Sequence, residues 1–194
     1  VVNGERYTAD KIIIATGSKP AKLRCKGAEE AIDSNEFLKL EHLPGRLTIV
    51  GGGVIGLEFA SIAAAYGSEV TVLEYCPEIL PNFDADIAKR LRSYLGRRGI
   101  EIVTGAEVTE IKADKSVVYT RKGKEKSVDG DMVLSAVGRR PVIPNGCEAA
   151  GIALDRRGFI VTDETMQTSV AGIYAIGDVN GRCLLAHAAS AQGR

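Results

Sequence analysis

The chain has 194 residues, of which 45% are hydrophobic and 5% aromatic, and its 25 basic residues are balanced by 25 acidic ones. A formal net charge of zero argues against a nucleic-acid partner or a polybasic membrane surface, and the low aromatic content argues against stacking platforms for bases. The 22 glycines exceed the roughly 14 of an average protein of this length. This excess suggests tight turns and close approach of the backbone to a ligand.

The four cysteines lie far apart in the sequence, at Cys25, Cys76, Cys147 and Cys183. No CxxC pair is present, so neither a metal site nor a local redox pair is expected. We interpret the cysteines as reduced thiols of a cytoplasmic protein. The sequence has no signal peptide and no apolar run that is long enough to span a membrane.

The first 45 residues predict one strand followed by a connection. Lys11–Gly17 is a short apolar run that ends in small residues, which is typical of a buried parallel strand. Residues 18–45 contain several prolines and glycines and little periodicity. We expect one short helix there, near Glu36–Leu40.

Residues 46–74 have the pattern of a β-α-β unit. Leu47–Val50 is an apolar strand, and Leu57–Tyr66 is apolar nearly all round, which predicts a buried helix. Gly67 is expected to end this helix, and Glu69–Glu74 forms the second strand.

The rest of the chain predicts one more helix and several strands. Asp84 is a candidate N-cap for a helix that ends near Gly99. The remaining expected elements are a strand at 100–103, an antiparallel meander at 108–111, 117–120 and 126–128, a buried strand at 132–137, a hairpin at 152–161 and an apolar strand at 172–178.

The segment Gly51-x-Gly53-x-x-Gly56 has the spacing of a dinucleotide-binding loop between a strand and a helix. Gly51 would let the backbone turn sharply, Gly53 would leave room for a pyrophosphate, and Gly56 would let the helix pack closely on the strand. Free N–H groups and the helix dipole would then face the phosphates. The alternative is a glycine-rich helix start without a ligand.

Two acidic residues extend this prediction. Glu74 ends the second strand, where a carboxylate accepts hydrogen bonds from an adenosine ribose and repels a 2′-phosphate, so we predict NAD rather than NADP. Glu58 lies near the start of the helix. It either interacts with the helix N-terminus or lies near the nicotinamide end of the ligand.

Two further strand ends carry candidate ligand residues. Thr16-Gly17 and Gly177-Asp178 both end short apolar strands, and α/β proteins place ligands at the carboxyl ends of parallel strands. Asp178 could accept a hydrogen bond from a ribityl or ribose hydroxyl.

Four motifs resemble, in order, those of the flavoprotein disulfide reductases: Ile14–Pro20, Gly51–Ala60, Ala136–Pro141 and Ala175–Val179. Within that family, Glu74 followed by Ile79–Pro81 and then by Leu184–His187 is most similar to the dihydrolipoamide dehydrogenases.

The resemblance implies an α/β fold with a Rossmann-like NAD-binding domain at residues 45–165, in which a parallel sheet is joined by the antiparallel meander. Partial FAD-domain segments would flank it at 1–44 and 166–194. The residues expected to line NAD are Gly51, Gly52, Gly53, Val54, Ile55, Gly56, Glu58, Glu74, Val108 and Gly138. Those expected to contact FAD are Gly17, Asp178 and Ala186.

In this family, electrons pass between dihydrolipoamide, a cysteine pair, the flavin and NAD, and the whole enzyme is expected to be a homodimer. The 194 residues contain neither the family's redox CxxxxC nor its FAD glycine motif nor its His–Glu pair, so we assign no catalytic residue and interpret His187 as structural. We expect a piece of a longer protein that alone lacks disulfide reductase activity and binds FAD poorly.

Three alternatives stay open. An NADH oxidase, a peroxidase or a CoA-disulfide reductase of the same family would use a single redox cysteine in place of a pair. An NADPH-linked glutathione or mercuric reductase is disfavoured by Glu74. A nucleotide-binding module without chemistry is the alternative from another class.

Overall fold

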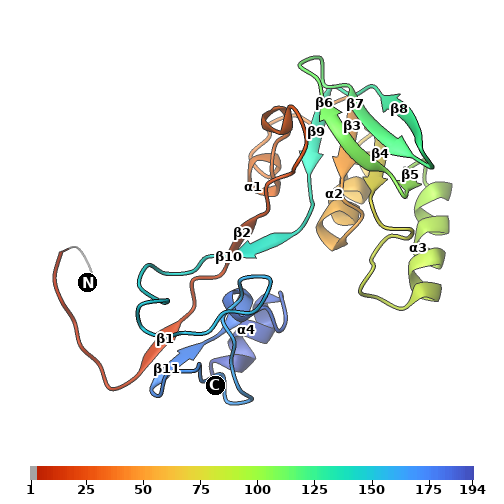
Figure 1. Cartoon of the computed structure of the whole chain (residues 1–194). Coiled ribbons are helices and arrows are strands. Elements are labelled where there is room, and N and C mark those ends of the chain that lie inside the picture. Colours follow the sequence, from red (N-terminus) through yellow and green to blue (C-terminus); the bar gives the residue numbers. More distant parts are fainter. Residues whose placement is uncertain (1–3) are drawn as a thin grey trace. The chain divides into compact units, whose positions relative to one another are not determined.

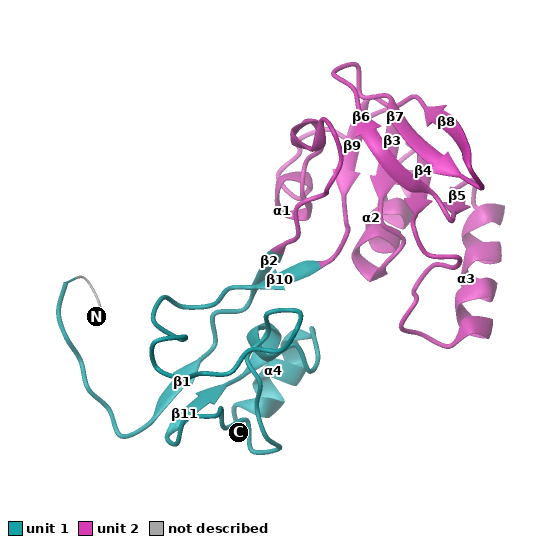
Figure 2. Cartoon of the chain, in the orientation of Figure 1, with its two compact units in different colours: residues 1–19, 139–194 teal, residues 20–138 magenta. Residues whose placement is uncertain are grey.

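Residues 4–194 are described by a computed structural model, and the chain divides into two compact units (Figures 1 and 2). Unit 1 combines the residues up to Lys19 with Arg139–Arg194, and unit 2 is Pro20–Gly138. The predicted NAD-binding domain at 45–165 and the observed unit 2 therefore differ at both ends.

A four-stranded parallel sheet forms the centre of unit 2. Its order is β5 (Glu101–Thr104), β4 (Glu69–Glu74), β3 (Arg46–Val50) and β9 (Met132–Ser135). Alternate residues of these strands contribute to two separate apolar clusters, Ile49 to one and Val50 to the other. Both faces of the sheet are therefore covered, which explains the nearly continuous apolar sequence of its strands.

Helices cover one face of this sheet. They are α1 (Ser34–Phe37), α2 (Val54–Ala65) and α3 (Ala85–Arg97). The Asp84 side chain accepts hydrogen bonds from the N–H groups of Asp86 and Ile87, so the predicted N-cap of α3 is confirmed.

The prediction that α2 is buried all round was wrong. Leu57, Ala60 and Ala63 are buried against the sheet, but Ile62 is 47% exposed and Tyr66 82% exposed. The helix covers the sheet with one face only, and its apolar outer face has no cover within the part of the chain that the structure describes.

The other face of the parallel sheet is covered by the predicted meander, which is confirmed. β6 (Glu107–Ile111), β7 (Val117–Arg121) and β8 (Lys124–Val128) pair antiparallel in that order. Ile111, Val117 and Tyr119 are buried in the cluster that includes Val50.

The connection at residues 20–44 belongs to unit 2. Lys26 forms a bridge with Glu110 and Ile32 forms one with Leu134, so backbone hydrogen bonds attach this segment to both sheets. A 3₁₀ helix, η1 (Ala28–Glu30), precedes α1. Helix α1 begins before the predicted range because Asp33 and Glu36 form a capping box.

Unit 1 contains a parallel pair of strands, β1 (Ile12–Ile14) and β11 (Ile173–Ala175). It also contains β10 (Arg139–Pro141), which pairs with β2 (Ser18–Pro20), a strand whose last residue is the first residue of unit 2. A 3₁₀ helix, η2 (Gly177–Asn180), and α4 (Ala186–Gln192) follow β11. The parallel direction predicted for the first strand is confirmed.

Two predictions for unit 1 differ from the structure: the first strand is not buried throughout, and the pairing in the hairpin at 152–161 is shorter than predicted. Ile13 is 60% exposed, because a two-stranded sheet leaves much of β1 uncovered within residues 4–194. The predicted hairpin at 152–161 is reduced to a single bridge between Leu154 and Ile160. Ile160 packs with Ile14 and Ala175, which explains why residues after 139 belong to unit 1.

None of the helices within residues 4–194 is both long enough and apolar enough to cross a bilayer.

Candidate dinucleotide-binding site

The candidate site lies where β3 and β4 end at the same edge of the parallel sheet. The two strands pair up to Val50 and Leu73, and the N–H of Gly51 continues the ladder by donating to the Leu73 carbonyl at 2.9 Å. The chain then turns through Gly52 and Gly53 into α2. This turn brings the first residues of α2 close to the end of the neighbouring strand.

The glycines at the two ends of the loop are required by close backbone approach. Gly51 has a φ of +115°, and a Cβ at this position would lie 2.4 Å from the carbonyl oxygen of Ala136. A Cβ on Gly56 would lie 2.1 Å from the Gly51 carbonyl oxygen. The positive φ agrees with the predicted sharp turn at Gly51, and the short distance at Gly56 agrees with the predicted close helix packing.

Gly53 is different, because a Cβ there would meet no atom within 4 Å. Gly53 is the N-cap of α2 and provides no side chain to cap the helix. The N–H groups of Val54, Ile55 and Gly56 precede the first intrahelical bond, which Leu57 donates to the Gly53 carbonyl. Open space therefore lies beside a set of backbone donors that can bind an anion.

Glu74 is buried, with 7% of the residue exposed, and its carboxylate contacts the loop directly. Oε2 accepts a hydrogen bond from the Gly52 N–H at 2.5 Å, and Oε1 accepts one from the Cys76 N–H at 2.6 Å. A carboxylate has about four lone-pair positions, so these two backbone bonds do not use its whole acceptor capacity. Burial, followed by the nearby Glu74 carboxylate, raises the pKa of the Cys76 thiol.

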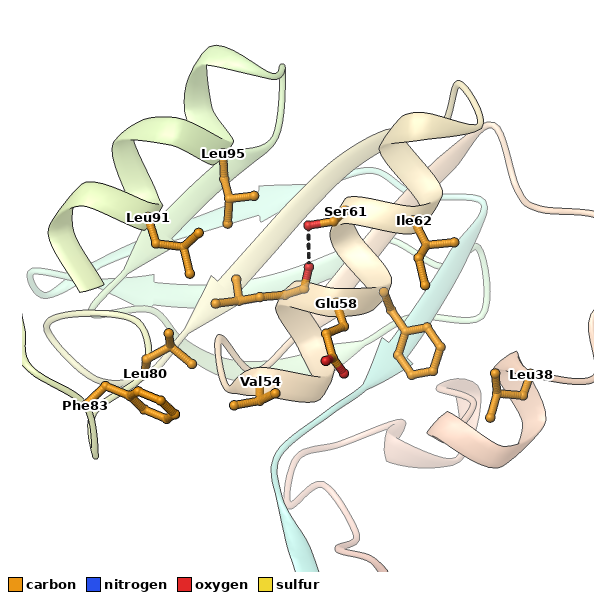
Figure 3. A pocket seen from close by; sticks show the side chains of 11 residues that line it. Leu38, Val54, Glu58, Ser61, Ile62, Leu80, Phe83, Leu91 and Leu95 are labelled. Atoms are coloured by element: carbon orange, nitrogen blue, oxygen red, sulfur yellow. Dashed lines mark hydrogen bonds between the residues drawn. The ribbon is translucent and has the colours of Figure 1, made fainter. Parts of the chain in front are cut away.

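Glu58 lies on the exposed side of α2 and lines an apolar groove of about 780 Å³. Figure 3 shows its carboxylate beside Val54, and apolar side chains from α2, α3 and the segment after β4, such as Ile62, Leu91 and Leu80, line the rest of the groove. The Ser61 hydroxyl donates to the Leu57 carbonyl and is not free to donate to a ligand. Glu58 is the charged residue among those that line the groove.

The two remaining predicted residues of unit 2, Gly138 and Val108, lie outside the glycine loop. Gly138 follows β9, two residues after Ala136, whose carbonyl lies against Gly51. Val108 lies on β6, and its half-buried side chain packs on the second apolar cluster. The structure thus gives Val108 a packing role.

The residues predicted to contact a flavin all lie in unit 1. Gly17 has a φ of +69° between β1 and β2, Asp178 lies in η2, and Ala186 is the exposed first residue of α4. The Ser18 hydroxyl donates to Asp178 Oδ2 at 2.6 Å, and Arg139 Nε donates to the Ser18 hydroxyl at 2.6 Å. This chain of hydrogen bonds orients the Asp178 carboxylate.

Two contacts of the loop were not predicted from the sequence. Leu80 was predicted only as part of a family motif, but its N–H donates to the Gly52 carbonyl at 3.0 Å. The contact between Ala136 and Gly51 was not predicted. Within residues 4–194 the four cysteines are free, and no three of the His, Cys, Asp and Glu side chains are grouped to hold a metal ion.

The parallel sheet, its glycine loop and the buried acid at the next strand end define unit 2 as a Rossmann-like α/β fold. A family model described as pyridine nucleotide-disulphide oxidoreductase matches residues 1–193. The chain belongs to that family.

Its relatives agree with this assignment. The chain is 44% identical to the dihydrolipoyl dehydrogenase of Acholeplasma laidlawii over its whole length, covering 58% of that protein, and 42% identical to that of Mycoplasma pneumoniae, covering 43%. Among solved structures, the HOCl-induced flavoprotein disulfide reductase RclA from Escherichia coli matches 94% of the chain with a TM-score of 0.81 and 35% identity, and the chain covers 42% of it. The chain thus spans about half the length of its relatives.

These comparisons confirm the family and the fold class that the sequence predicted. The cofactor classes that were expected, a pyridine nucleotide and a flavin, are the ones named in the family description and in the name of the structural relative.

Proposed function

We propose that unit 2 binds NAD(H) and is the pyridine-nucleotide portion of a dihydrolipoyl dehydrogenase-like flavoprotein. The observation that carries the proposal is the meeting, at one sheet edge, of open space at Gly53 with the buried carboxylate of Glu74. The loop backbone would bind the diphosphate, and the remaining acceptor capacity of the Glu74 carboxylate would bind the adenosine ribose.

The residues present fit a dinucleotide better than a plain helix start. A helix start without a ligand gives no reason for the open space at Gly53 beside free N–H groups. It also gives no reason for a buried acid that is aimed at the same loop. When bound, the nicotinamide supplies hydride transfer. Glu58, at the groove beside the first turn of α2, would lie near that end of the ligand.

In the whole protein we propose that unit 1 supplies part of a flavin site through Gly17, Asp178 and Ala186. Asp178 would use its second oxygen, Oδ1, because Oδ2 accepts from Ser18. The expected substrate is a dithiol or disulfide, with lipoamide favoured by the names of the relatives, and a homodimer is expected. A cytoplasmic location fits the four free cysteines.

The test compares NADH with NADPH on the purified 194-residue chain. NADH should raise the melting temperature more than NADPH does, because the Glu74 carboxylate repels a 2′-phosphate. Isothermal titration should give the same order of affinities, and Glu74→Arg should weaken the binding of NADH. Equal shifts with both nucleotides, or none with either, would contradict the proposal.

A further inference from the structure

Both backbone polar groups of Gly52 are held, one by Glu74, the last residue of β4, and the other by Leu80 in the segment after this strand. The N–H donates to Oε2 of Glu74 at 2.5 Å, and the carbonyl accepts from the Leu80 N–H at 3.0 Å. A Cβ on Gly52 would lie 3.1 Å from Glu74 Oε2 and 3.0 Å from Ile79 Cγ2, so the same segment also closes over its Cα. These contacts fix the backbone of Gly52, although glycine has more conformational freedom than other residues.

The Glu74 carboxylate is itself anchored. Its second oxygen accepts from the Cys76 N–H, and the backbone around it is tied to the turn between β5 and β6. The Ala106 N–H donates to the Glu74 carbonyl, and the Gly105 N–H donates to the Cys76 carbonyl, both at 2.9 Å. Because both oxygens of the Glu74 carboxylate accept hydrogen bonds from backbone N–H groups, the carboxylate has a fixed position and can fix Gly52 in the loop.

Leu80 reaches Gly52 from a backbone conformation that leucine rarely adopts, with a φ of +50°. Its side chain is 8% exposed and belongs to the main apolar cluster of unit 2. This packing holds the backbone in the left-handed region, and the conformation aims the N–H at the Gly52 carbonyl.

We propose that Glu74 and Leu80 are positioning residues that clamp Gly52 and preset the diphosphate-binding loop before a nucleotide arrives. The inference rests on the proposed function and adds to it. Glu74 acts on the diphosphate through the loop, besides any contact that it makes with the ribose. A preset loop binds its ligand without the cost of ordering three consecutive glycines.

The two roles of Glu74 are separated by a ligand that has no ribose hydroxyls. The probes are ADP and 2′,3′-dideoxyadenosine 5′-diphosphate, titrated into the 194-residue chain and followed by NMR. Glu74→Gln keeps the shape of the side chain but places an NH₂ group against one of the two backbone N–H donors. We expect this variant to bind both probes roughly tenfold more weakly.

Glu69→Gln is the matched control, because Glu69 is the exposed first residue of the same strand and the substitution removes the same charge. It should leave both affinities unchanged. Titrations are made well below the melting temperature of each variant, so a loss of global stability does not change the result.

A loss of ADP affinity without a loss of dideoxy-ADP affinity would overturn the clamp and leave Glu74 as a ribose ligand only. If the unaltered chain binds neither probe and no NADH, the proposed function itself fails. Amide hydrogen exchange of the unaltered chain gives a test that needs no variant. The Gly52 amide should exchange more slowly than the Gly53 amide, and equal rates would contradict the clamp.

Discussion

Gly51 and Ala136 approach each other so closely that no side chain fits between them. A Cβ on Gly51 would lie 2.4 Å from the Ala136 carbonyl oxygen and 2.7 Å from its carbonyl carbon. The Ala136 N–H in turn donates to the Val50 carbonyl at 2.8 Å, so the ladder between β3 and β9 holds Ala136 in place. The contact joins the start of the glycine loop to the end of the neighbouring strand.

Gly51→Ala should therefore destabilise unit 2 by more than about 3 kcal/mol, as the sum of backbone strain and steric overlap. Urea unfolding followed by circular dichroism measures the change. Gly99→Ala separates the two causes, because Gly99 has a φ of +84° and no atom within 4 Å of an added Cβ. It should cost only about 1–2 kcal/mol, the strain alone.

Gly96→Ala completes the comparison. Gly96 lies inside α3, and an added Cβ would meet no atom within 4 Å. This variant should be more stable than the unaltered chain by about 0.5–1 kcal/mol. Similar destabilisation by Gly51→Ala and Gly99→Ala would show that the contact with Ala136 is not close in solution.

Gly53→Ala should separate binding from folding. Gly53 has an ordinary extended conformation, with φ −79° and ψ −178°, and open space around its Cα. The stability of unit 2 should change by no more than about 1 kcal/mol. The methyl group would occupy the space proposed for the diphosphate, so NADH affinity should fall at least about tenfold.

Isothermal titration with NADH checks the Gly53 prediction, and Gly96→Ala is its control, since it makes the same change away from the loop. NADH affinity that survives Gly53→Ala would place the ligand elsewhere.

The turn at Gly51, the open space at Gly53 and the close packing at Gly56 could be predicted from sequence because each is local, whereas the contact of Gly51 with Ala136 is not. A turn from a strand into a helix has the same requirements in any protein with this spacing, and the positive φ at Gly51, the short distance at Gly56 and the open space at Gly53 agree with them. The meander was predictable for a similar reason, since alternating residues and polar turns mark each of its strands.

Other features could not be predicted, because their partners are distant or are backbone groups. Glu74 was predicted from its position as a ligand residue, but its contact with Gly52 is to an N–H that any residue would present. The bridges at Lys26 and Ile32 that attach residues 20–44 to unit 2 are also backbone contacts. The outer face of α2 was assigned to a core because composition does not show on which side a helix is covered.

The 194-residue chain, purified alone, should be colourless. The residues proposed to contact FAD are spread over short segments of unit 1, and the family's FAD glycine motif is not among the 194 residues. An absorption spectrum of the purified protein, before and after addition of FAD and gel filtration, checks this. A stoichiometric flavin spectrum would overturn the expectation of weak FAD binding.

The pair formed by Arg46 and Asp131 joins the start of β3 to the residue before β9. Arg46 donates to the Asp131 carboxylate from its backbone N–H at 2.8 Å and from Nη2 at 2.7 Å. The pKa of Asp131 is lowered from 3.8, chiefly by the Arg46 side chain and then by its backbone N–H.

Because the folded state lowers this pKa, the pair contributes its full stabilisation above pH 3.8, and the contribution is lost as the pH falls through the folded-state value. Asp131→Asn should therefore be less stable than the unaltered chain at neutral pH, and the difference should shrink below pH 3.8. Both side chains are nearly half exposed, so the difference should be small and should decrease with added salt. Urea unfolding at a series of pH values measures it, with Glu125→Gln as the control for an exposed carboxylate on β8. Stability curves that stay parallel down to the most acidic pH would show that the Asp131 carboxylate is not stabilised by Arg46.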